Sequence, residues 1–229
     1  MSALEAPTRR SLATRAKLIS VAERLFAERS INGVSLNEIS KAAGQRNTNA
    51  CQYHFGDKQG LLQAILDKHV PGIAAEREAM LAKLVRSGRE PGLRALVQAF
   101  VRPVAAKLHD ADGGREFIRI NAQLVALHTL SVRGVPASPL RLARADRFSR
   151  ALRRALRAAR TPAAVAQQRL MLAAVLVFHG LDDHSRLLDA SGGRGAGDSA
   201  LFVANLEDSI VALLSAPVSA ATMRAMRRS

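Results

Sequence analysis

Seven polar or aromatic side chains lie between positions 46 and 54, and their types suit contacts with DNA. Asparagine and glutamine pair bidentately with adenine in the major groove, each good pair discriminating by roughly 1–3 kcal/mol, and arginine reaches guanine or phosphate. We therefore predict Asn49 and Gln52 as base-reading residues and Arg46 as a guanine or phosphate contact. The full set is Arg46, Asn47, Thr48, Asn49, Gln52, Tyr53 and His54.

Catalysis by a thiol is the competing chemistry at the same place. Cys51 and His54 are three residues apart, so a helix would put them on one side. Cys51 nevertheless falls on the predicted buried face, and no nearby group is evident that would orient the histidine or hold an oxyanion. We predict that the protein is not an enzyme and that it uses no cofactor and no metal. A DNA-binding structural protein without an effector is a third hypothesis.

Short helices must position the cluster, because the apolar residues before it recur at helical spacing. A first helix is predicted from Thr14 to Ser30, followed by a left-handed turn at Asn32-Gly33. Ser35 and Glu38 stand at capping-box spacing and open a second helix, which Gly44 closes. The apolar faces are Ile19, Ala22, Leu25 and Phe26 in the first helix, and Leu36, Ile39, Ala42 and Ala43 in the second.

A third short helix carries the rest of the cluster, with Asn47 or Thr48 as its expected cap. It uses so few residues for burial that it needs an external partner. Two short helices joined by a tight turn are typical of a helix-turn-helix DNA reader. The residues expected to pack inward are Ala50, Cys51 and Phe55, and those expected to project outward are Asn49, Gln52, Tyr53 and His54.

An ordered series of motifs runs through this region. The motifs are LFAE at 25–28, GVSLNEI at 33–39, AAG at 42–44, and YHFGDK at 53–58 followed by Leu61-Leu62. With them, the stretch from about 14 to 69 resembles the N-terminal DNA-binding domain of the TetR family of bacterial transcriptional regulators. The family usually has eleven residues from the turn glycine to the phenylalanine, whereas Gly44 to Phe55 is twelve, and Gln52 stands where tyrosine is common. We therefore expect a turn that is one residue longer.

The resemblance supports phosphate-anchoring roles for Tyr53, His54 and Lys58, and Ser35 at a helix N-terminus is expected to join them. Packing or capping is the alternative role for His54. The resemblance also implies a fourth helix that links two domains, for which Asp57 is the expected cap.

The rest of the chain keeps a helical apolar period, which predicts an all-α protein. We divide it into a flexible basic arm (1–13), a helix-turn-helix DNA-binding domain (14–57) and a larger helical ligand-binding and dimerisation domain (58–229). Pro71-Gly72 is expected to break or kink the fourth helix. Further helices are expected at 92–108, 114–130, 139–159, 162–188 and 199–214, with a short one after Pro217.

TetR-like proteins usually hold a ligand pocket and a dimer interface in the C-terminal part. Large or polar groups inside otherwise aliphatic helices are compatible with a mostly apolar cavity, although each alone also fits an ordinary core. The stretches 170–181 and 206–214 are apolar over more of their circumference than one contact needs, which suits a four-helix dimer bundle; burial within the monomer is the alternative. The candidate ligand residues are Phe100, Phe117, Asn121, Gln123, His128, Met171, Phe178 and His179.

Two segments invite other functions. Eight arginines between 141 and 160 suggest a second DNA site, but the apolar residues there fall on one side, which favours a solvated helical face. The glycine-rich run 192–197 suggests a phosphate cradle, but it follows no strand and precedes no suitable lysine, which favours a loop.

Composition agrees with a DNA partner and a reducing compartment. The net charge of +15 suits a polyanion, although an arginine-rich composition alone could produce it. One cysteine excludes an internal disulfide, and the N-terminus shows no secretion signal. The longest uncharged apolar run, 170–181, is shorter than the roughly 20 residues that span a bilayer. We expect a cytoplasmic protein without a membrane segment.

Together these features predict a ligand-responsive transcriptional regulator, most simply a repressor. It would bind double-stranded, palindromic operator DNA as a homodimer, and a small-molecule effector, hydrophobic or weakly anionic, would release it.

Overall fold

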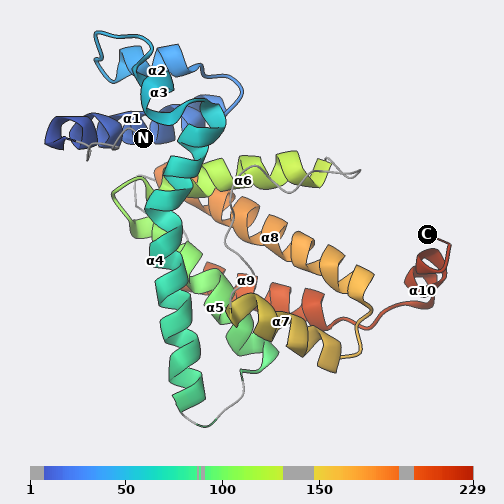
Figure 1. Ribbon diagram of the computed structural model, residues 1–229. Coiled ribbons are helices and arrows are strands. Elements are labelled where there is room, and N and C mark those ends of the chain that lie inside the picture. Colours follow the sequence, from blue (N-terminus) through green and yellow to red (C-terminus); the bar gives the residue numbers. More distant parts are fainter. Residues whose placement is uncertain (1–7, 87, 89–90, 131–146, 191–198, 229) are drawn as a thin grey trace, which may run out of the picture.

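The computed structural model describes residues 8–86, 88, 91–130, 147–190 and 199–228, and the side chains of 127–130 are not among those described. Every regular element in these ranges is a helix, as the apolar period predicted. Figure 1 shows the long α1 with the short α2 and α3 at one end of a larger helical body, and α4 running from this end along the body.

The N-terminal helices are α1 (Arg9–Arg29), α2 (Leu36–Ala42) and α3 (Ala50–Phe55). Helix α1 begins five residues earlier than predicted, so the expected arm (1–13) is helical from Arg9 onward. The Thr8 side chain accepts a hydrogen bond from the Ser11 amide at 3.2 Å and caps this start. The capping bond satisfies an end amide, so the first turn forms without the apolar period on which the prediction relied.

The turn between α2 and α3 is long, as expected. Gly44 occupies it with a φ of +68°, which a side chain would resist. The Asn47 Oδ1 accepts a hydrogen bond from the Asn49 amide at 2.9 Å and shapes the turn. Asn49, rather than Asn47 or Thr48, is the residue before the first helical one, and its side chain makes no capping bond. Asn49 therefore projects from the helix start and not from its body.

Helix α4 (Lys58–Arg86) runs unbroken through Pro71, so the predicted break is wrong. Proline removes one backbone hydrogen bond from a helix. Pro71 itself is exposed, but residues before and after it on α4 are packed in the core. Ile65 and Leu66 are buried before it and Ile73 and Leu81 after it, so packing on both sides keeps the helix continuous. The start is capped as predicted, since the Asp57 Oδ1 accepts from the Gly60 amide at 2.7 Å.

The larger body contains the predicted helices with small shifts at their ends. The expected helix 139–159 is described only from Arg147, and the glycine-rich run 192–197 lies outside the described residues. Helix α6 packs against both α1 and α8 (Figure 1). The elements are α5 (Leu93–Ala105), η1 (Ala106–His109), α6 (Gly114–Leu130), α7 (Arg147–Ala158), α8 (Ala163–Ala190), α9 (Ser199–Ser215) and α10 (Ala220–Met226).

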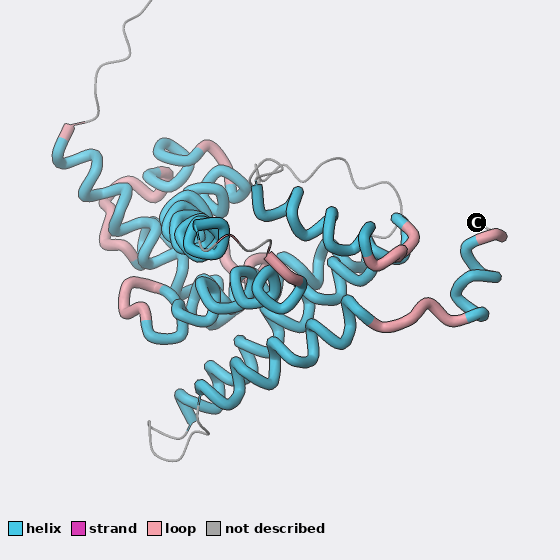
Figure 2. The backbone as a smooth tube through the Cα atoms, turned by 90° about the horizontal axis from the view of Figure 1, so that it is seen from below, coloured by secondary structure: helices cyan, strands magenta, loops and turns pink. Residues whose placement is uncertain are grey.

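Figure 2 looks along α4 and shows α10 standing away from the body, in agreement with its lack of buried residues. In the described ranges, α8 is long and apolar enough to cross a membrane, and the bent pair α9 and α10 passes the same test together. Such a signal is weak, because the core helix of a globular protein also passes it. Only 22% of the apolar window of α8 is buried; the buried side of the helix, which includes Asp182 and His184, packs against α6 and α9.

Candidate nucleic-acid interface and internal cavity

A capping box fixes the start of α2. The Ser35 amide and hydroxyl both donate to Glu38 Oε2 at 2.8 Å, and the Glu38 amide donates back to the Ser35 hydroxyl at 3.2 Å. These bonds, chiefly that from the Ser35 amide, lower the pKa of Glu38 to about 2. The Ser35 hydroxyl, a predicted phosphate anchor, is thus already engaged in holding the helix.

One face of α3 is buried against α2. Ala50 and Cys51 lie in the core, and the Cys51 amide donates to the Ser40 hydroxyl at 3.0 Å. Burial raises the pKa of the Cys51 thiol, which keeps it protonated. A protonated, buried thiol is a poor nucleophile, so the geometry disfavours the thiol chemistry considered for Cys51 and His54.

The opposite side of this segment faces solvent. Tyr53 is 83% exposed, the most exposed of the large hydrophobic side chains described. His54 is half-buried, and burial, with the nearby charge of Arg15, lowers the pKa of its imidazole. The other exposed members of the predicted set are Arg46, Asn47, Thr48, Asn49 and Gln52.

Two basic side chains bond to backbone carbonyls around α3 and stabilise the position of this helix. The Lys58 Nζ donates to the Ile31 carbonyl at 2.9 Å, so this predicted phosphate anchor also ties the start of α4 to the loop after α1. The Arg15 Nη1 donates to the His54 carbonyl at 2.9 Å, and its guanidinium lies 4.4 Å from the centre of the Phe55 ring. These contacts hold the C-terminal end of α3 in place.

The predicted ligand residues do not gather in one cavity. Phe100 alone among them lines the large cavity described below. Phe117 is buried beside His69, with ring centres 4.6 Å apart, and the Asn121 amide group donates back to the Phe117 carbonyl at 2.8 Å. Met171 is exposed, and Phe178 and His179 are half-buried away from the cavity lining. His128 belongs to α6, but its side chain lies outside the described ones.

Gln123 has a different place, at the junction of the N-terminal helices and the body. Its Oε1 accepts from the Ile31 amide at 2.8 Å, and its Nε2 donates to the Phe26 carbonyl at 2.9 Å. Helix ends leave backbone groups without partners. A side chain of α6 therefore satisfies the end of α1.

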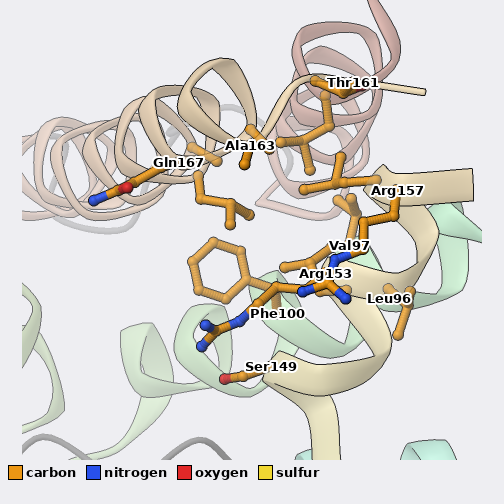
Figure 3. Close-up of a pocket in the computed structure, with 15 residues that line it drawn as sticks. Leu96, Val97, Phe100, Ser149, Arg153, Arg157, Thr161, Ala163 and Gln167 are labelled. Atoms are coloured by element: carbon orange, nitrogen blue, oxygen red, sulfur yellow. The ribbon is translucent and has the colours of Figure 1, made fainter. Parts of the chain in front are cut away.

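A cavity of about 620 Å³ lies between α5, α7, α8 and α9. Figure 3 shows Phe100 at its centre, with Arg153 and Arg157 from α7 on one side and Ala163 from α8 on the other. The sequence prediction named only Phe100 of this lining, because the leucines and alanines that make up much of it resemble ordinary core residues. The lining residues are Leu96, Val97, Phe100, Ser149, Leu152, Arg153, Leu156, Arg157, Thr161, Ala163, Ala166, Gln167, Leu170, Ala173 and Leu214.

The cavity is connected to α4 through aromatic rings. Phe100 stacks on Phe148, with ring centres 6.0 Å apart. The Arg77 guanidinium of α4 lies 4.6 Å from the centre of the Phe148 ring, and its Nε donates to the Ala99 carbonyl at 3.1 Å. The Arg77 guanidinium also lies 5.9 Å from the centre of the Phe100 ring, so one side chain of α4 contacts both rings.

Three helices, the short second and third joined by a turn and the third exposing polar groups, define a helix-turn-helix DNA-binding domain. Residues 18–65 match the family model described as bacterial regulatory proteins, tetR family. The match confirms the resemblance of this N-terminal domain to the TetR family, whose members are DNA-binding transcriptional regulators, and it covers these residues alone.

Several solved structures are similar to the chain over most of its length. One, described as the molecular basis for control of antibiotic production by bacterial hormones, is 20% identical, covers 88% of this chain and 97% of its own, and has a TM-score of 0.44. A TetR-family structure from Rhodococcus sp. is 19% identical, with coverages of 88% and 98% and a TM-score of 0.40. Another from Pectobacterium atrosepticum is 24% identical, with coverages of 92% and 100% and a TM-score of 0.35. No curated protein sequence matches significantly.

Proposed function

We propose that the protein is a ligand-responsive repressor that binds a palindromic operator as a homodimer and is released by a small-molecule effector. The main support for DNA binding is that the segment 46–54 has one buried side and one exposed polar side. Ala50 and Cys51 are buried, while Arg46, Gln52 and Tyr53 are exposed on the segment's other side. Side chains so displayed on a short helix reach base edges in a major groove.

Within this interface we assign different roles. Gln52 and Asn49 read bases, and Arg46 contacts guanine or phosphate from the turn. Tyr53 and His54 contact phosphates, and Lys58 does so with the donor hydrogens that its bond to the Ile31 carbonyl leaves over. Residues 14–57 form the DNA-reading unit and 58–229 the ligand-binding and dimerisation unit, in the cytoplasm.

The DNA part is tested by selecting operator sequences from random duplexes and measuring affinity for the best one. Gln52→Ala should cost about 1–3 kcal/mol at one base position and relax specificity there. Cys51→Ser should leave affinity largely intact, and affinity should fall steeply with salt. A Gln52→Ala variant that keeps both the wild-type affinity for the operator and the wild-type preference among bases would remove Gln52 from the readout. An affinity for the operator that does not fall as the salt concentration rises would refute the proposal that the protein binds DNA.

Exposed apolar side chains support the homodimer. Leu172, Leu176 and Leu187 recur at helical spacing on α8, and Leu201 is exposed on α9. An isologous four-helix bundle of α8 and α9 from two copies would cover them. Sedimentation equilibrium should find a dimer, and Leu176→Glu should shift it toward monomer. The matched control is Leu12→Glu, which places the same charge at an exposed leucine of α1.

The cavity and the ring contacts support the effector part. Two recognition helices must lie roughly 34–36 Å apart to enter successive major grooves. An effector that displaces Phe100 would move Arg77 and with it α4, which only two residues separate from α3. The coupling is reciprocal, so operator DNA must weaken effector binding by the same factor. Titrating effector with and without operator tests this, and equal affinities in the two titrations would refute the coupling.

A further inference from the structure

We propose that the cavity between α5, α7, α8 and α9 accepts an amphipathic monoanion, whose apolar body lies against Phe100 and whose carboxylate lies between Arg153 and Arg157. This inference rests on the proposal that the cavity is the effector site, and it names the chemical class of the effector.

The interior of the cavity suits a hydrocarbon body. Its volume of about 620 Å³ falls within the range of small-molecule sites. Leu96, Val97 and Phe100 of α5 and Leu152 and Leu156 of α7 supply apolar walls. A polar molecule buried there would lose hydrogen bonds to water that these side chains cannot replace. The body of the ligand should therefore be apolar.

The edge of the cavity is positively charged. Arg153 and Arg157 are four residues apart on α7, so they lie one turn apart on the same side of the helix. Both are exposed, so their stems cover the cavity while their guanidinium groups reach toward water (Figure 3). No acidic side chain is among the described residues that line the cavity.

The guanidinium groups of these two arginines are also available for a ligand. In the described part of the chain, the side chain of neither Arg153 nor Arg157 makes a hydrogen bond or ion pair. Several other arginines of the body do have a carboxylate or carbonyl partner. Those partnered arginines are Arg77, Arg94, Arg102, Arg115, Arg119, Arg147, Arg169 and Arg186.

Two unpaired guanidinium groups beside an apolar cavity select the charge of the ligand. Arginine binds carboxylate bidentately, and such charge-assisted bonds are roughly twice as strong as neutral ones. A cationic amphiphile would meet like charge at the same edge and is disfavoured. A neutral one would gain the apolar contacts alone.

The test compares ligands that differ only in their head group. Decanoate and 2-naphthoate provide a chain and a ring with a carboxylate, and 1-decanol and 2-naphthol are their neutral counterparts. Isothermal titration calorimetry on the full-length protein should show at least one carboxylate binding about tenfold more tightly than its alcohol. The double variant Arg153→Gln/Arg157→Gln should abolish that preference, and added salt should weaken it.

Arg154→Gln is the matched control, because Arg154 is an exposed arginine of the same helix that does not line the cavity. It should leave the preference for the carboxylate unchanged. Ala166→Phe fills the cavity, and it should abolish binding of acid and alcohol alike. Circular dichroism confirms that each variant is folded.

The two proposals fail in different ways. Equal binding of acids and alcohols, no binding of either acid, or full carboxylate preference in the double variant would overturn the assignment of an anionic ligand. Carboxylate binding that depends on both arginines but leaves operator affinity unchanged would uphold this ligand class and overturn the effector role of the cavity.

Discussion

Replacing Gln123 with methionine should destabilise the protein by about 2–4 kcal/mol. The Gln123 side chain satisfies the Ile31 amide at 2.8 Å and the Phe26 carbonyl at 2.9 Å, and both bonds are partly buried. A buried polar group left without its partner costs about 1–3 kcal/mol. Because water still reaches the site in part, we take the lower half of that range for each of the two groups. Methionine has a similar length, so the loss of packing adds little.

Urea denaturation followed by circular dichroism measures the free energy of unfolding at a fixed protein concentration, since dimerisation contributes to it. For a chain of this size, each kcal/mol shifts the melting temperature by about 2–4 °C. The control is Gln168→Met, the same substitution at an exposed position of α8, which should stay within about 0.5 kcal/mol. A Gln123→Met variant as stable as this control would refute the role given to Gln123 in holding the end of α1.

Three further variants test other contacts. Glu23→Gln should cost about 3 kcal/mol in the same denaturation assay, because Glu23 is 1% exposed and its carboxylate pairs with His69 at 2.8 Å. The pKa of Glu38 lies at about 2 against an ordinary 4.5, so the capping box contributes stability above pH 4.5 that is lost as the pH falls toward 2. Ser35→Ala should reduce that acid dependence in part, because alanine keeps the backbone amide that bonds Glu38 and removes only the hydroxyl; an unchanged pH profile would contradict the contribution of the hydroxyl. Arg77→Met should leave operator affinity near wild type and reduce release by effector, whereas full release would exclude the contact of Arg77 with Phe148 from the coupling.

The helices of this protein were largely predictable, because their signals are local. Capping pairs such as Ser35 with Glu38 and the apolar period along each segment act within a few residues. The errors arose where contacts with other parts of the chain determine where a helix begins or ends. Pro71 does not break α4, since buried residues on both sides hold the helix, and no local rule reports their burial. The start of α1 was missed because a cap at Thr8 outweighed a weak apolar pattern.

The residues displayed on the segment 46–54 were more accessible to prediction than those that line the cavity. They are consecutive on one short segment, so their types alone indicate which side faces solvent. The cavity instead combines residues of four helices, and its leucines and alanines look the same in the sequence as those of any core. Gln123 was assigned to the ligand, but its partners lie more than ninety residues away in the sequence.

By itself, the sequence determined the all-α class, the capped helix-turn-helix segment and the residues displayed on it, because these depend on neighbours within a turn or two. Only the tertiary structure decided that Lys58 and Gln123 brace the end of α1, that Phe100 connects a cavity with Arg77 of α4, and that Arg153 and Arg157 stand unpaired at its edge. The physical reason is that empty space, and charges without partners, are properties of how distant segments pack.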